Sequence, residues 1–144
     1  MNITLLEIDA NLKSYADSYL GINTYYSHIV LIPNDVEYPM MLVEYGNSSF
    51  PEGAVEHSVT CNFLDILNDA QDNDISILSR MEQMIVDFKT NYLQLKDVTR
   101  GFYIPDTKPV ATKIQISNPD NAIGYSISFI IVAPNDSYLT DIPL

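Results

Sequence analysis

Two residues of this chain have the chemistry of a nucleophile and its base. His57 and Cys61 lie four positions apart in a segment whose apolar residues alternate. That period of two is typical of a strand, and four residues along a strand span roughly 13 Å. A nucleophile and the base that activates it lie about 3 Å apart. The spacing therefore argues against a catalytic Cys–His pair and favours a small buried thiol and a histidine at a strand end.

A second group of residues has the chemistry of a divalent cation site. Asp69, Asp72 and Asp74 follow one another closely, and calcium takes oxygen ligands. An EF-hand loop that starts at Asp72 requires Gly at its sixth position and Glu at its twelfth. The sequence has Ile77 and Gln83 there, so the match fails. A capped, solvated loop is favoured, and a loose divalent site is the alternative.

Other catalytic motifs are absent from the sequence. It contains no Gly-x-Ser-x-Gly, no glycine-rich phosphate loop, no Cys-x-x-Cys and no His-Glu-x-x-His. The ten tyrosines lack neighbouring basic residues, so they are interpreted as core and interface anchors rather than as stacking platforms for bases. We therefore expect no enzymatic activity, no cofactor and no metal, and a small enzyme is the least favoured class.

Length and charge restrict the class of protein. The chain has 144 residues, the size of one domain, and its single cysteine excludes an internal disulfide. The net charge is −12, and the ten acidic residues between Ser14 and Ser79 are accompanied by no Lys or Arg. Such acidity argues against binding to nucleic acid. No basic segment follows Met1 and no apolar run reaches about 20 residues, so we expect neither a signal peptide nor a membrane span.

The longest helical pattern runs from Ile75 to Leu95 and follows the acidic loop. Its apolar stripe consists of Leu78, Met81, Ile85, Phe88, Tyr92 and Leu95. Asp74 is the expected N-cap. We predict that this stripe packs on the face of the preceding strand that carries Val59, Cys61 and Phe63.

A shorter helix is predicted over residues 4–20. Thr4 and Glu7 form a capping box. Gly21 is placed to end the helix in a left-handed conformation. The predicted apolar stripe of this helix is Leu5, Ile8, Leu12, Tyr15 and Tyr19.

Five strands are predicted, over residues 24–32, 40–45, 57–67, 110–117 and 122–133. Residues 46–56 are expected to form a long polar loop, and residues 96–109 a loose connection. The element order α-β-β-β-α-β-β predicts an α+β fold, with a mostly antiparallel sheet of about five strands and two helices on one face. We expect a single domain over residues 1–133 and an extended C-terminal arm over residues 134–144.

This order resembles that of the tail-completion and tail-terminator proteins of tailed bacteriophages. The matching features are an N-terminal helix, Tyr38-Pro39 before an apolar strand, a strand running into Asp65, an acidic loop, a long helix and a closing hairpin. The resemblance covers most of the chain. It implies a structural virion protein that is assembled in the bacterial cytoplasm and forms a homo-oligomeric ring at the head–tail neck or tail, as a terminator, completion protein or connector.

The resemblance also implies partners. The ring would contact further copies of itself and neighbouring neck, portal or tail proteins, and DNA would pass through it without specific binding. No membrane contact is implied. The alternative is a non-enzymatic adaptor or binding module that acts as a monomer or dimer.

Two segments that the core does not need are the expected interface. The loop over residues 46–56 carries one apolar anchor and the arm carries four. These residues are Phe50, Tyr138, Leu139, Ile142 and Leu144. The opposing interpretation is a floppy loop and a frayed tail.

Overall fold

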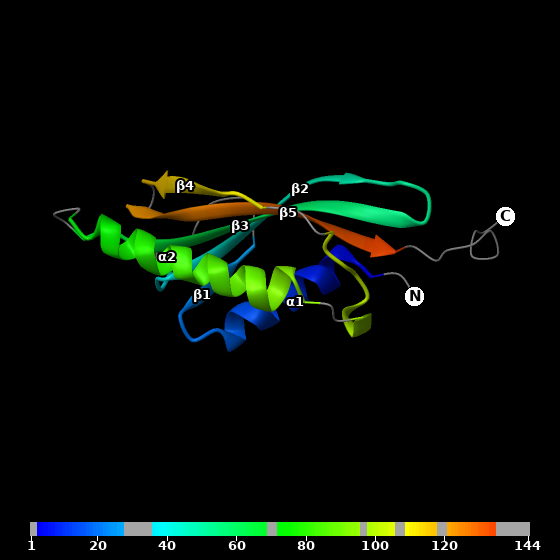
Figure 1. Cartoon of the computed structure of the whole chain (residues 1–144), viewed down its shortest axis with the longest axis horizontal. Coiled ribbons are helices and arrows are strands. Elements are labelled where there is room, and N and C mark those ends of the chain that lie inside the picture. The colour runs from blue at the N-terminus through cyan, green and yellow to red at the C-terminus, as the bar shows by residue number, and fades with distance from the viewer. Residues whose placement is uncertain are drawn as a thin grey trace.

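The computed structural model describes residues 3–27, 36–68, 72–95, 98–105, 109–117 and 121–134. It contains a five-stranded mixed sheet and two α-helices, which lie on the same side of the sheet (Figure 1). The elements are α1 (Leu5–Ser18), β1 (Thr24–Tyr26), β2 (Met40–Ser49), β3 (Ala54–Ile66), α2 (Asp74–Phe88), a π-helical turn η1 (Lys89–Leu93), a 3-10 turn η2 (Val98–Arg100), β4 (Ala111–Ile116) and β5 (Ala122–Pro134). The α+β class is confirmed.

The strand order in the sheet is β1-β2-β3-β5-β4. β1 runs parallel to β2, whereas β2–β3, β3–β5 and β5–β4 are antiparallel pairs. The sheet is therefore mixed, because the first two strands run parallel where the sequence predicts a mostly antiparallel sheet. Side chains fix the parallel alignment: Asn23 donates from Nδ2 to the Tyr38 carbonyl at 2.7 Å, and the Thr24 hydroxyl donates to the Glu37 carbonyl at 2.7 Å.

The segment from Gly46 to Glu56 is a strand extension, not the long loop that the sequence predicts. β2 continues to Ser49 and β3 begins at Ala54, and a bulge between Tyr45 and Ser48 absorbs the extra residues. Gly53, with φ of +80°, makes the sharp turn that a left-handed backbone allows. The resulting β2–β3 hairpin projects beyond both helices (Figure 1).

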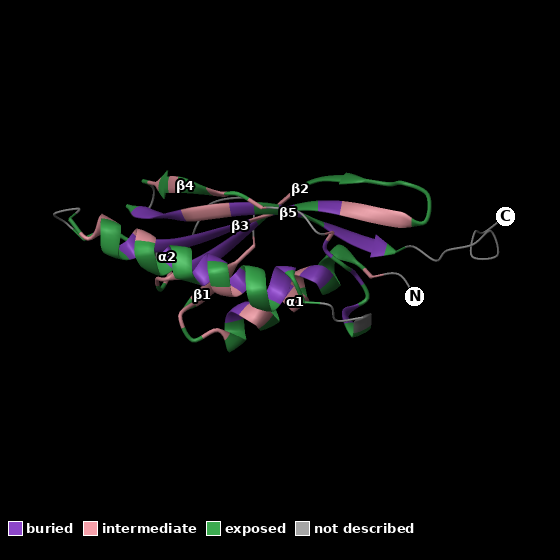
Figure 2. Ribbon diagram, in the orientation of Figure 1, coloured by how far each residue is buried: buried purple, intermediate pink, exposed green. Residues whose placement is uncertain are grey.

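The main core lies between the sheet and the helices, whose inner faces are buried (Figure 2). Val59, Cys61 and Phe63 on β3 are buried in the same cluster as Met81 and Phe88 on α2. The predicted packing of the long helix on this strand face is thus confirmed. A smaller apolar cluster on the other side of the sheet consists of Met40, Leu42, Leu64 and Ala122. β2 is therefore covered on both faces at its start, as its run of apolar residues predicts.

Helix α1 begins as predicted and ends early. The Thr4 hydroxyl accepts a hydrogen bond from the Glu7 amide at 3.2 Å, as an N-cap does. The helix ends at Ser18, and Tyr19 is extended. The prediction for Gly21 is wrong, since its φ is not positive. A Cβ at Gly21 would lie 2.8 Å from the Tyr19 ring and 3.0 Å from the Met84 methyl, so these side chains would have to shift to admit one.

The long helix also differs from its prediction at both ends. Asn73, not Asp74, is the N-cap residue, and its side chain caps no helix amide. Asn73 instead accepts from the Asn68 amide at 2.9 Å, which closes the preceding turn. At the other end the π-helical turn η1 widens the helix and buries two consecutive side chains, Tyr92 and Leu93, while Leu95 is exposed.

The connection after the long helix is packed where the structure describes it. Arg100 is buried and donates to the Tyr92 carbonyl at 3.3 Å and to the Leu95 carbonyl at 3.2 Å. A cation at the C-terminal end of a helix complements its dipole. Phe102 and Ile104 enter the main core, so residues 98–105 are not the loose segment that was expected. No helix in the described part of the chain is long and apolar enough to cross a membrane.

Candidate functional site

The two residues with nucleophile and base chemistry are separate structural groups. Cys61 is completely buried beneath the helices, and this burial raises the pKa of its thiol. His57 is the fourth residue of β3, near the turn of the β2–β3 hairpin. Its Nδ1 is 3.0 Å from the Ser48 hydroxyl. Burial lowers the pKa of His57. Cys61 is the small buried thiol that its spacing predicts. The expectation for His57 is wrong, because β3 begins at Ala54 and His57 lies inside the strand, paired with Ser48 and Ile131, rather than at its end.

The acidic loop is closed by its own side chains. Asn68 and Asp72 form reciprocal hydrogen bonds, from the Asn68 amide group to the Asp72 carboxylate at 2.6 Å and from the Asp72 backbone amide to the Asn68 side chain at 3.1 Å. Asp74 accepts from the Ile75 amide at 2.9 Å, and Asp69 lies outside the described residues. Within the described residues, no three His, Cys, Asp or Glu side chains are grouped to hold a metal ion.

Asp9 on α1 is the centre of a hydroxyl network. Its Oδ1 accepts from the Tyr25 hydroxyl at 2.7 Å and from the Tyr45 hydroxyl at 2.6 Å, and its Oδ2 accepts from Ser27 at 3.1 Å. Burial raises the pKa of both tyrosines, and their contact with the carboxylate raises it further. Both hydroxyls therefore stay protonated as donors, and the network ties α1 to β1 and β2.

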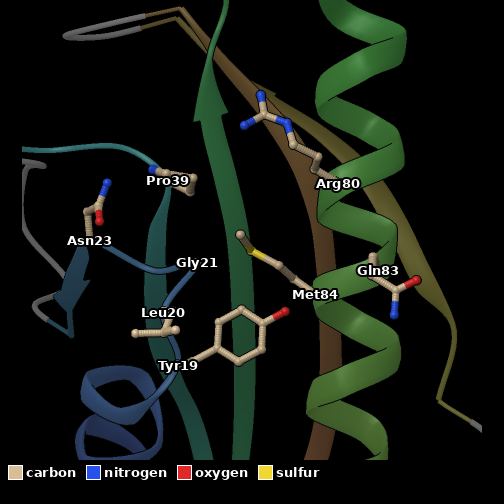
Figure 3. Close-up of a pocket in the computed structure, with 8 residues that line it drawn as sticks. All are labelled: Tyr19, Leu20, Gly21, Asn23, Pro39, Arg80, Gln83 and Met84. Carbon is tan, nitrogen blue, oxygen red and sulfur yellow. The ribbon is translucent and has the colours of Figure 1, made fainter.

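An open pocket of about 390 Å³ lies between the end of α1 and the middle of α2 (Figure 3). Tyr19, Leu20 and Gly21 form one wall, with Asn23 and Pro39 beside them. Arg80, Gln83 and Met84 of α2 form the opposite wall. We refer to this site as the Arg80 pocket. Its volume is within the usual range for binding pockets.

The Arg80 pocket combines an exposed apolar side chain with one cationic group. Leu20 is 99% exposed at its rim. Arg80 pairs with Asp65 at the end of β3, where its Nη2 lies 2.8 Å from Oδ2. The Asp65 side chain is 10% exposed and that of Arg80 54% exposed, so the guanidinium reaches solvent while its partner is buried. The pocket therefore offers a solvent-accessible cation that directly follows the acidic stretch from Ser14 to Ser79.

The wall formed by Tyr19 is fixed by a second polar contact. Its hydroxyl donates to Asp87 Oδ2 at 2.5 Å, and Gln83 donates to the other carboxylate oxygen at 3.1 Å. Burial and the contact with Asp87 raise the pKa of Tyr19 to about 12. This bond joins the end of α1 to α2 and holds the two walls at a set separation.

Of the five predicted interface residues, the structure describes one. Phe50 is at the tip of the β2–β3 hairpin and is 76% exposed. It is followed by Pro51, whose carbonyl accepts from the Ala54 amide at 3.2 Å and closes the turn. Tyr138, Leu139, Ile142 and Leu144 lie outside the described residues. The structure thus brings Phe50 to an ordered, projecting tip.

The pocket was not foreseen from the sequence. Leu20 comes directly after Tyr19, the last residue of the first helical stripe, and does not fit the helical spacing of that stripe. This spacing is the one local sign that the Leu20 side chain is not part of the core. Arg80 is the first basic residue after the long acidic stretch, so the sequence singles it out. The sequence does not indicate which residues lie around it in the fold. Leu20 and Arg80 lie at the same pocket because α1 packs against α2, and no local sequence pattern predicts this.

No protein-family model matches the sequence, and a search of curated proteins gives no match either.

Proposed function

We propose that the chain is a structural protein of a tailed bacteriophage that assembles as a homo-oligomeric ring at the head–tail neck or in the tail. The element order of the resemblance supports this proposal, since a helix, three strands, a long helix and two strands occur in that sequence. The acidic composition, with a net charge of −12, suits a passage for DNA because negative walls repel phosphates.

The observation that carries the proposal is the projecting hairpin with an exposed aromatic side chain. A heterologous ring requires two different surfaces on each subunit. Phe50 at the hairpin tip and Leu20 at the rim of the Arg80 pocket are large apolar residues with more than three-quarters of their surface exposed, at 76% and 99%. An aromatic side chain such as Phe50 is of the kind that is enriched in protein–protein interfaces.

The test is the mass and shape of the purified protein. Native mass spectrometry and negative-stain electron microscopy should show a closed ring of one defined subunit number, and mass spectrometry of purified virions should detect the chain. A chain that remains monomeric at high concentration, and that is missing from virions, would contradict the proposal.

A non-enzymatic adaptor that acts as a monomer or dimer is the second candidate. The Arg80 pocket favours it, since an exposed guanidinium beside apolar walls suits an acidic peptide of another protein. The same mass measurement separates the two candidates. An adaptor gives a monomer or dimer that binds its partner with unchanged stoichiometry at every concentration, whereas the ring protein associates with itself.

A further inference from the structure

Two features of the subunit complement each other in shape and lie apart from each other. The hairpin tip is convex and carries Phe50. The Arg80 pocket is concave, and its lining includes the apolar residues Leu20, Pro39 and Met84 beside polar ones. Pro39, which lines the pocket, immediately precedes β2, and Phe50 immediately follows it. Eleven residues of an extended strand span roughly 36 Å. The hairpin of a subunit therefore cannot reach its own pocket.

The two features also complement each other in charge. Glu52 is two residues from Phe50 in the exposed turn, so the tip carries a carboxylate as well as an aromatic ring. The pocket presents the Arg80 guanidinium, which remains 54% exposed despite its pair with Asp65. A guanidinium has five donors, so pairing with one carboxylate leaves it able to bind a second.

We propose that Phe50 of one copy inserts into the Arg80 pocket of the next copy, where its ring packs on Leu20 and Met84 and Glu52 meets Arg80. The inference rests on the proposed ring and names the contact between its subunits. A knob and a pocket on different parts of the same subunit produce a head-to-tail contact, which closes into a ring when the rotation between subunits permits. A central aromatic anchor in a pocket is the arrangement of the strongest interface residues.

The test uses two variants that each destroy one half of the contact. Phe50→Ala removes the knob, and Leu20→Glu places a carboxylate at the pocket rim. Both side chains are exposed, so neither change disturbs the core, and unchanged circular dichroism and thermal midpoints verify this. Leu6→Glu is the matched control, because Leu6 is 79% exposed on α1 and does not line the pocket. Each contact variant should weaken self-association by roughly 30-fold or more, whereas the control assembles as the unchanged chain.

Mixing the two variants provides the decisive measurement. Neither variant forms rings alone, but the mixture retains one intact contact, between the Phe50 of the pocket variant and the pocket of the Phe50→Ala variant. Native mass spectrometry should then show a 1:1 heterodimer and nothing larger. Glu52→Lys should weaken assembly roughly tenfold through repulsion from Arg80.

Three results would overturn this contact. They are rings formed by either contact variant at the concentration used for the unchanged chain, a mixture that gives no heterodimer, and a Leu6→Glu control that fails together with the pocket variant. In each case rings of the unchanged chain would leave the proposed function intact. An unchanged chain that is monomeric at every concentration overturns both.

Discussion

Asp9 is the residue on which three hydroxyl groups from outside its own helix converge. Its carboxylate binds Tyr25, Tyr45 and Ser27, and removing it leaves these donors without their acceptor. We expect Asp9→Ala to lower the free energy of unfolding by about 2–4 kcal/mol, measured by urea denaturation. Asp17→Asn is the control, because it removes an exposed ion pair to Lys13 on the same helix and should change stability by less than about 0.5 kcal/mol. Equal losses for the two variants would contradict the role of the network.

His57 makes the stability of the protein depend on pH, and the burial of its side chain sets the direction of this dependence. Its pKa is lowered in the folded state, so the unfolded chain binds more protons as the pH falls. His57 therefore destabilises the fold as the pH falls below about 6.5, and this penalty is absent above it. We expect the unchanged chain to lose more stability between pH 7.5 and 5.5 than His57→Gln, as measured by urea midpoints. Parallel losses in both proteins would show that His57 does not contribute.

At the scale of elements, the contact between α2 and the sheet depends on Phe88. Its side chain is completely buried, and its ring lies 5.3 Å from that of Phe63 and 5.8 Å from that of Phe129. Phe88→Ala should cost about 3–5 kcal/mol of unfolding free energy because it leaves a cavity. Val86→Ala on the solvent side of the same helix, 53% exposed, should cost far less. A loss below about 1 kcal/mol for Phe88→Ala would contradict this packing.

The two longest strands also depend on one position without a side chain. A Cβ at Gly124 of β5 would lie 1.7 Å from the Phe63 carbonyl oxygen of β3, so Gly124→Ala must push the central strands apart. We expect this variant not to fold, as judged by the loss of a cooperative thermal transition. Gly53→Ala tests backbone strain alone, because its Cβ would meet nothing within 4 Å at a φ of +80°, and it should cost only about 1–2 kcal/mol. A folded Gly124→Ala variant would refute the close approach of the strands.

The elements that the sequence predicts well are those with long periodic patterns. The stripe from Met81 to Tyr92 and the alternation of Val59, Cys61 and Phe63 on β3 give the correct faces, because burial requires these periods. The hairpin extension was missed, because Gly46 to Ser49 are polar residues typical of loops and only pairing with β3 makes them a strand. The Arg80 pocket and the Asp9 network join distant segments, so local patterns contain no signal for them.

At the scale of the whole molecule, the arm after β5 provides the remaining prediction. β5 ends at Pro134, so deleting Ser137 to Leu144 should leave the unfolding free energy of the subunit unchanged. It should weaken ring assembly, because it removes the apolar residues that were assigned to subunit or partner contacts. The thermal midpoint and the native mass of the truncated chain give both results. A truncated chain that assembles and joins its particle as well as the full chain would show that the arm is only a tail.

The pairing of β3 with β5 joins Ile66 to Ala122 and Ala54 to Pro134, across the whole of α2 and β4. These contacts of high sequence separation require a large loop to close before they stabilise anything. Folding should consequently be slow for a chain of this size. During synthesis, the β2–β3 hairpin leaves the ribosome well before β5, so one edge of β3 stays unpaired in the interval. An unpaired edge is a template for aggregation, and the nascent chain is most exposed to it just before β5 arrives.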